Sequence, residues 1–260
     1  MNAPRHVQVS KYYLKPLGEE RGRFMMYQCD VAVYEPEIVN VIAHVVRPGD
    51  LVVDAGANMG VFTVILSKMV GDAGKVIAFE PEFRGFNYLM DNIGLNKLTN
   101  VEAFKHGLFS HDCQLDLWIP GPSGYSSCHH YLQSESSEKI WCRPLDDLAL
   151  DRQPRFMKID CEGVEEEILR GGERMLRTGV DFIVLELNFH LMRQVGRSDR
   201  TLRDYMHSLG YEMYLIHVLA DGGGYCPPDL IETRKALELM DNGHINVMFS
   251  TPEKIKECWQ

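Results

Sequence analysis

The segment from Asp54 to Gly60, DAGANMG, constrains the fold more than any other part of this sequence. It follows a short apolar run that ends at Asp54 and precedes a helical apolar pattern that begins at Val61. A glycine-bearing turn from a buried strand into a helix is typical of doubly wound α/β folds, in which ligands bind at the carboxyl ends of the strands. Gly56 and Gly60 have no Cβ, so the backbone there can approach a ligand closely. The segment therefore predicts both a fold class and a binding site.

The rest of the chain continues an alternation of short apolar strands with helices. The expected strands cover 51–54, 75–80, 101–105, 156–160, 181–187, 211–218 and 245–250, and the expected helices cover 35–46, 61–69, 83–93, 164–169 and 201–209. This alternation indicates a mostly parallel sheet with helices on both faces. The last two strands lack a crossover of ordinary form, so we expect at least one antiparallel strand at the end of the chain.

The length of 260 residues suits one large α/β domain with a short extension. We expect an N-terminal cap and entry helix over 1–46, with a strand around 24–33, and a ligand-binding domain over 47–260. The stretches 121–139 and 219–243 are the least regular, and we interpret them as variable insertions on the substrate side. For 121–139, which holds His129 and His130, a lid over the substrate and a polar surface loop both stay open.

Charge and cysteine content argue against several classes of protein. The net charge of −10 disfavours nucleic-acid binding, which requires neutralisation of phosphates, and we interpret the arginines of 193–203 as a solvated helix face. The seven cysteines form no C-x-x-C pair, so neither a zinc site nor a disulfide framework is expected. No signal peptide and no membrane span are recognisable, and we expect a cytoplasmic protein with reduced thiols.

The glycine turn differs from the common nucleotide motifs. It lacks the third glycine of the dinucleotide fingerprint and the Gly-Lys-Ser/Thr ending of a phosphate-binding loop. The free N–H groups of the helix that begins at Val61 favour a negative group, such as the carboxylate of an amino-acid moiety. Glu80 ends the next strand, where a carboxylate can accept hydrogen bonds from both ribose hydroxyls. The alternatives are a purely geometric turn and a solvent-exposed acid at a strand end.

Several motifs taken together resemble the FkbM family of methyltransferases, over about residues 30–190. They are DAGANMG (54–60), FEP (79–81), KIDCEG (158–163) and LELN (185–188), preceded by YEPEI (34–38) and RPGD (47–50). The resemblance implies a class I methyltransferase fold, which is a Rossmann-like seven-stranded sheet with one antiparallel strand, and S-adenosylmethionine as cofactor. It also implies a hydroxyl acceptor on a sugar, glycolipid or polyketide in most members, and nitrogen in some.

The same resemblance assigns cofactor contacts. The methionine part of the cofactor is expected against Asp54, Gly56, Asn58 and Gly60, and its ribose against Glu80. The adenine is expected near His106, where the family often has Asn-x-Ala, so this position departs from the pattern. The strand that ends at Asp160 is expected to point at the transferring methyl group, which places Asp160 at the cofactor as well.

Methyl transfer to an alcohol requires a group that removes a proton, either a base or a metal ion. Asp160 is the first candidate for a base or a substrate orienter, whereas Glu162 could instead cap the following helix. Glu186 ends the next strand, on the same side as Asn188, and His190 follows as a second candidate base. Asp160, Glu186 and His190 could also hold a divalent metal, but the sequence offers no compact ligand cluster, so we predict no metal.

We therefore predict an S-adenosylmethionine-dependent enzyme that methylates a hydroxyl of a sugar, glycolipid or natural product. One alternative is an N-methyltransferase for an amide or amine of a peptide or small molecule, and another is a non-catalytic binding protein with the same fold. A nucleotide oxidoreductase is disfavoured by the missing third glycine. The expected partners are a small-molecule, glycan or peptide acceptor and, for the aromatic N-terminal cap, a second subunit in a homodimer.

Overall fold

The computed structural model describes residues 35–120, 127–128, 134–194, 196–216 and 244–259. The strand expected around 24–33, the His129–His130 pair and the insertion expected at 219–243 lie outside these residues. None of the helices in the described ranges is long and apolar enough to cross a membrane.

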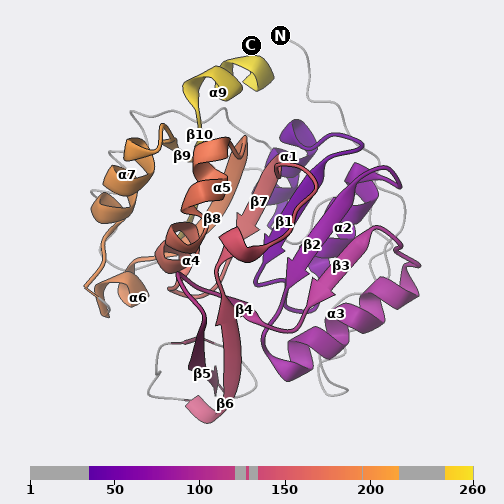
Figure 1. Ribbon diagram of the computed structural model, residues 1–260, viewed down its shortest axis with the longest axis vertical. Coiled ribbons are helices and arrows are strands. Elements are labelled where there is room, and N and C mark those ends of the chain that lie inside the picture. The colour runs from indigo at the N-terminus through magenta and orange to yellow at the C-terminus, as the bar shows by residue number, and fades with distance from the viewer. Residues whose placement is uncertain (1–34, 121–126, 129–133, 195, 217–243, 260) are drawn as a thin grey trace.

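A seven-stranded sheet in the order β3-β2-β1-β7-β8-β10-β9 forms the centre of the molecule (Figure 1). Its strands are β1 (Leu51–Ala55), β2 (Lys75–Phe79), β3 (Val101–Phe104), β7 (Phe156–Ile159), β8 (Phe182–Asn188), β9 (Glu212–Leu215) and β10 (His244–Ser250). The pairs from β3 to β8 are parallel, and β10 runs antiparallel to both β8 and β9. This order confirms the predicted doubly wound, mostly parallel sheet with one antiparallel strand.

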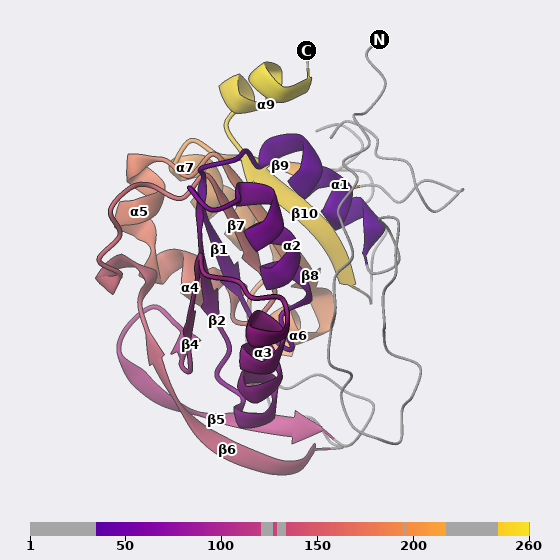
Figure 2. The ribbon, with the colours of Figure 1, turned by 90° about the vertical axis from the view of Figure 1, so that its right-hand side faces the viewer.

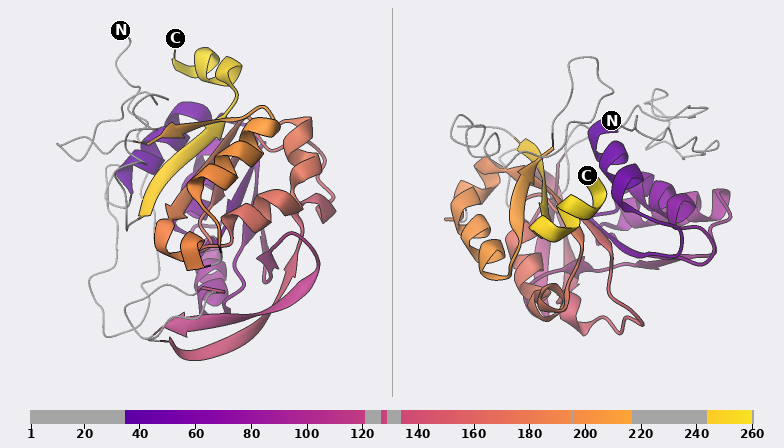
Figure 3. Two further views of the ribbon diagram at one scale, coloured as in Figure 1. Left: turned by 90° about the vertical axis from the view of Figure 1, so that its left-hand side faces the viewer. Right: turned by 90° about the horizontal axis from the view of Figure 1, so that it is seen from above.

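Helices cover both faces of the sheet (Figure 2). On one face lie α1 (Pro36–Val45), α2 (Val61–Val70) and α3 (Phe83–Leu95), and on the other lie α4 (Glu165–Gly171), α5 (Glu173–Thr178) and α7 (Asp199–Ser208). The short helix α6 (Phe189–Gln194) follows β8, and α9 (Pro252–Trp259) follows β10 at the opposite end of the sheet (Figure 3). The sequence did not predict α5, α6 or α9, and α3 continues through Gly94, where we expected it to end.

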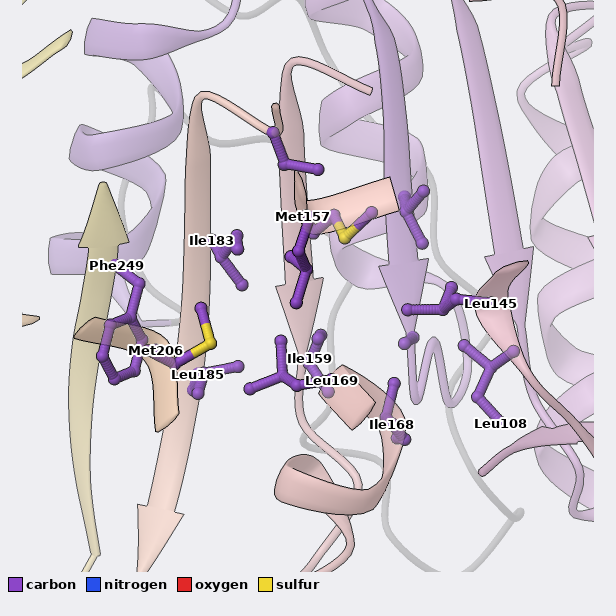
Figure 4. Packing of buried hydrophobic residues seen from close by; sticks show 14 of the residues in the cluster. Leu108, Leu145, Met157, Ile159, Ile168, Leu169, Ile183, Leu185, Met206 and Phe249 are labelled. Atoms are coloured by element: carbon purple, nitrogen blue, oxygen red, sulfur yellow. The ribbon is translucent and has the colours of Figure 1, made fainter. Parts of the chain in front are cut away.

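Alternation along the strands divides the core into two layers. Figure 4 shows Met157, Ile159, Ile183 and Leu185 of the sheet packed against α4 and α7. The alternate residues of the same strands, such as Phe156 and Val184, face α1 and α2. Both faces are buried, which is why the central strands are almost continuously apolar. Lys158, in the middle of β7, is one exception, and it lies on the face that α2 covers.

The predicted loop 121–139 is partly wrong. Ser134–Arg143 forms strand β6, which pairs with β5 (Cys113–Pro120) in an antiparallel hairpin, and β4 (Gly107–Leu108) adds a third strand. The hairpin crosses beneath the main sheet in Figures 1 and 2, on the side where the parallel strands end. The segment SESSEK (134–139) has no apolar residue, so only its pairing with β5 makes it a strand.

Candidate functional site

The glycine turn and the end of β7 meet where the order of the strands reverses. The chain passes from β1 outward to β2 and β3, and then returns to place β7 on the other side of β1. Ligands in doubly wound folds bind at this switch point. Gly56 has φ +78°, and a Cβ there would lie 1.9 Å from the carbonyl oxygen of Asp160. The two strand ends are therefore packed together at a distance that only glycine permits.

Asp54, at the end of β1, is completely buried. Its Oδ2 accepts a hydrogen bond of 2.5 Å from the hydroxyl of Thr63 in α2, while its Oδ1 has no partner among the described residues. Burial raises the pKa of Asp54, and the nearby Lys158 ammonium opposes the rise. A buried oxygen without a donor is costly, so this atom is positioned for a ligand that brings one.

Glu80 is held by two backbone groups. Its Oε2 accepts from the N–H of Asn58 at 2.7 Å, and its Oε1 accepts from the N–H of Glu82 at 2.8 Å. Burial raises the pKa of this carboxyl to about 7 despite both hydrogen bonds. Asn58 itself has φ +50°, and Gly60, with φ +93°, begins α2 without a side chain to accept from its first N–H groups. Each Glu80 oxygen keeps a second lone pair for another donor.

His106 lies at the end of the third strand in an aromatic group. Its ring centroid is 5.3 Å from that of Phe79 and 5.6 Å from that of Phe104, and its Nδ1 lies 2.9 Å from the carbonyl oxygen of Gly107. An apolar, ring-lined surface of this kind suits a flat heterocycle. The predicted adenine contact of His106 stays a prediction.

Three carboxylates converge beside this turn, on the ends of β7 and β8. One oxygen atom from each of Asp160, Glu162 and Glu186 lies within 4.8 Å of the others. The sequence offered no compact ligand cluster, and the structure forms this one by bringing Glu162 to Asp160 and Glu186. Such a group can share protons or surround a cation, and the absence of a metal stays a prediction.

Burial and repulsion between the acids raise the pKa of two carboxyls in this group. Burial, the Asp160 carboxylate and a hydrogen bond with it raise the pKa of Glu186 to about 9. Burial followed by repulsion from Asp160 and Glu165 raises the pKa of Glu162 to about 7, although a hydrogen bond with Asn188 opposes the rise. At neutral pH the group therefore holds at least one proton, on Glu186.

Lys158 is the counter-charge that the sequence analysis did not identify as a site residue. Its ammonium lies 2.8 Å from Oδ2 of Asp160 and 4.6 Å from the ring centroid of Phe62. Burial disfavours this ammonium, but Asp160 and Asp54 outweigh burial, so the pKa of Lys158 is raised. The signal in the sequence was a lysine inside an otherwise apolar strand, FMKI.

Glu165, the first residue of α4, fixes the loop that precedes this helix. Its Oε1 accepts from the N–H groups of Cys161 at 3.1 Å and Gly163 at 3.0 Å. A capping role for Glu162 stays a prediction, and its carboxylate lies beside those of Asp160 and Glu186.

His190 lies apart from the three carboxylates. It is exposed on α6, and its Nε2 lies 2.9 Å from Nε2 of Gln194. The third side chain beside Asp160 and Glu186 is Glu162. A catalytic role for His190 stays a prediction, with no contact to the acids to support it.

The entry helix reaches the same edge of the sheet. Asn246 of β10 pairs in register with Glu186 of β8, and its amide donates to Oε1 of Glu37 in α1 at 3.3 Å. Glu35, just before α1, is close enough to raise the pKa of both Lys158 and Glu186. No pattern in the sequence linked these residues, because 209 positions separate Glu37 from Asn246.

The comparisons with known proteins agree with this geometry. Residues 54–213, more than half of the chain, match the family model described as the methyltransferase FkbM domain. The comparison with curated proteins found no match.

Solved structures share the architecture at low sequence identity. An FkbM methyltransferase from Methylobacillus flagellatus is 17% identical over 84% of this chain and 56% of its own, with a TM-score of 0.49. The chain therefore spans little more than half the length of that protein. A protein provisionally described as an rRNA methylase, from Clostridium thermocellum, is 14% identical over 82% of this chain and 93% of its own, with a TM-score of 0.51. A SAM-dependent methyltransferase from Aquifex aeolicus is 17% identical over 83% and 88%, with a TM-score of 0.45.

Proposed function

Because the chain belongs to the FkbM family of methyltransferases, we propose that it transfers a methyl group from S-adenosylmethionine to a hydroxyl oxygen of a sugar, a glycolipid or another natural product. Membership of the family establishes that the class of enzyme is a methyltransferase. The identity of the methyl donor and the identity of the acceptor are what we propose. The observation that carries the choice of a hydroxyl is the group of carboxylates on Asp160, Glu162 and Glu186, since an alcohol must lose its proton to a nearby base.

The residues of the glycine turn fit this cofactor. The unpartnered Oδ1 of Asp54 suits an ammonium group of the methionine part, and the start of α2, which Gly60 leaves without a side-chain cap, suits its carboxylate. Glu80 keeps lone pairs for the ribose hydroxyls, and His106 borders a ring-lined surface for the base. When bound, S-adenosylmethionine supplies a methyl group that its sulfonium has already activated.

The protein contributes orientation and a proton acceptor. Asp160 is fixed by Lys158 at 2.8 Å, so it can hold a hydroxyl of the acceptor in one orientation. Glu186, which carries a proton at neutral pH, can donate a hydrogen bond to another oxygen of the acceptor. Ser127, which forms a β-bridge with Trp118 of β5, donates its hydroxyl hydrogen to the carbonyl of Glu162 at 2.8 Å and so connects the hairpin of β5 and β6 to this group. We propose that this hairpin forms the acceptor side of the site within a catalytic domain over 47–260.

The first experiment compares melting temperatures with and without S-adenosylhomocysteine, with NAD as a parallel control. A ligand at a hundredfold excess over its Kd stabilises the native state by about 2.7 kcal/mol, which raises the melting temperature by several degrees. The shift should disappear in Glu80→Ala and persist in the matched variant Glu82→Ala, whose backbone N–H still reaches position 80. A shift with NAD alone would contradict the methyltransferase proposal.

The second experiment identifies the acceptor. Labelled S-adenosylmethionine is incubated with a panel of methyl glycosides, glycolipids, macrolactones and peptide amides, and the position of the label is determined by mass spectrometry. Label on oxygen supports the proposal. Label on nitrogen would replace it with the N-methyltransferase alternative, and cofactor binding without transfer to any acceptor would favour a binding protein.

A further inference from the structure

We propose that Glu162 is the general base that removes the proton from the acceptor hydroxyl. This inference rests on the proposed function and names which of the three converging carboxylates takes the proton. In the step, the O–H bond of the acceptor breaks and its proton passes to the Glu162 carboxylate. The acceptor oxygen gains the methyl group, and the electron pair of the donor's carbon–sulfur bond stays on sulfur, leaving a neutral thioether.

The first support is the conformation and fixation of Glu162. Its backbone has φ +50°, a left-handed conformation that costs free energy for any residue except glycine. The Ser127 hydroxyl donates to its carbonyl oxygen at 2.8 Å, and its side chain hydrogen-bonds with Asn188. Strain of this kind persists where the surrounding structure fixes it, and such residues cluster at active sites. The neighbouring N–H groups of Cys161 and Gly163 are held by Glu165, so the side chain of Glu162 is not the one that fixes this loop.

The second support is that the other two carboxylates, those of Asp160 and Glu186, already interact with partners inside the protein. Oδ2 of Asp160 is paired with the buried Lys158 ammonium at 2.8 Å, and a carboxylate that shares its charge in this way is a poor proton acceptor. Glu186 hydrogen-bonds with Asp160 and already holds a proton at neutral pH. Glu162 is the remaining member of the group, and its carboxyl is only partly buried, so a substrate can reach it.

The proton affinity of Glu162 is suited to this task. The groups that face it are Asp160 and Lys158 from β7, Glu186 and Asn188 from β8, and Glu165 from α4. Burial, Asp160 and Glu165 raise its pKa to about 7, whereas Asn188 and Lys158 oppose the rise. A general base is most effective when its pKa is near the working pH, because it is then often ionised and still binds a proton well.

The decisive variant is Glu162→Gln, which keeps the size and the hydrogen bonding of the side chain. We expect kcat to fall by about 10²–10⁴-fold with the glycoside that reacts fastest in the acceptor panel. The Kd for S-adenosylhomocysteine, measured by calorimetry, should stay within about threefold, because the cofactor contacts are elsewhere. In the wild type, kcat should rise with pH through an apparent pKa near 7, and this limb should be absent in the variant. Glu167→Gln, a control in α4 that alters an ion pair with Arg197, should retain the limb.

Glu162→Gly provides a second variant whose folding is favoured. Glycine relieves the left-handed backbone, so the melting temperature should rise while kcat falls as in Glu162→Gln. Higher stability together with lost activity separates a catalytic role from a structural one.

The proposal is overturned if Glu162→Gln keeps wild-type kcat and its pH limb, or if Asp160→Asn removes the limb and Glu162→Gln does not. These results differ from a failure of the proposed function, in which the wild-type protein neither binds S-adenosylhomocysteine nor methylates any member of the panel.

Discussion

Glu186 shows how the environment of a single residue changes its chemistry. It has neighbouring acids on its own sheet and its pKa is raised from 4.5 to about 9, chiefly by burial and by Asp160. In the unfolded chain this carboxyl ionises at its ordinary pKa, so across this pH range the folded state binds the proton that the unfolded state has lost. The contribution of Glu186 to the free energy of unfolding therefore falls as the pH rises from about 4.5 towards 9.

This linkage can be isolated with Glu186→Gln, which resembles the protonated residue at every pH. The variant and the wild type should have similar melting temperatures near pH 4.5. The variant should then become progressively more stable than the wild type up to about pH 9, by several degrees. The measurement is thermal unfolding across this range without ligand. A difference that stays constant with pH would show that the folded chain does not hold this proton.

At the scale of elements, the turn between β1 and α2 both connects the two elements and forms part of the candidate site. Gly56 and Gly49 both have positive φ, at +78° and +90°, but they differ in the space around them. A Cβ at Gly56 would lie 1.9 Å from the Asp160 carbonyl oxygen, whereas nothing lies within 4 Å of one at Gly49. A comparison of substitutions at Gly49 and Gly56 therefore distinguishes the cost of backbone strain from the cost of disrupting the close contact between two strand ends.

We expect Gly49→Ala to cost about 1–2 kcal/mol of unfolding free energy, the usual cost of a left-handed residue with a Cβ. Gly56→Ala should cost more than about 3 kcal/mol, because overpacking against β7 is added to the same strain. It should also abolish the thermal shift with S-adenosylhomocysteine, since the turn must move. Chemical denaturation measures both costs, and equal values would show that the contact with Asp160 is unimportant.

The hairpin of β5 and β6 shows that the residue pattern along one strand does not always predict that strand. In β5, Leu115 and Leu117 alternate with polar residues, but we did not predict a strand there, and the partner segment SESSEK has no apolar face. Strand formation in 134–139 depends on cross-strand pairs such as Asp116 with Lys139, which only the folded chain provides.

At the scale of the whole molecule, the distribution of charge disfavours a nucleic-acid acceptor. The chain carries a net charge of −10, and the arginines predicted to form a solvated helix face are largely paired with acids. Arg197 contacts Glu166 and Glu167, and Arg203 contacts Asp199. A nucleic-acid acceptor would instead require a surface of unpaired basic residues to neutralise its phosphates.

We therefore expect the purified protein to transfer no labelled methyl group to total RNA at physiological salt, under conditions in which it methylates the best acceptor of the panel. The measurement is scintillation counting of precipitated RNA, with the reaction repeated at low salt, where electrostatic binding would be strongest. Label in RNA at either salt concentration would contradict the expected exclusion of nucleic acid and would favour a nucleic-acid substrate.

The local sequence determined the doubly wound class, the glycine turn from Asp54 to Gly60 and the positions of all seven strands of the main sheet. Period and turn chemistry are properties of consecutive residues, so they can be recognised without the fold. The same holds for the cofactor candidates Asp54 and Glu80, which directly end two apolar strands.

Only the tertiary structure decided what those residues face. It brought Glu162 to Asp160 and Glu186, placed the Lys158 ammonium among the acids, left His190 exposed on α6, and joined Glu37 to Asn246. These relations depend on strand order and on the angle at which a loop leaves a strand. The proton affinity of a carboxylate depends on charges within a few ångströms of it, and such neighbours come from segments that are distant in the sequence.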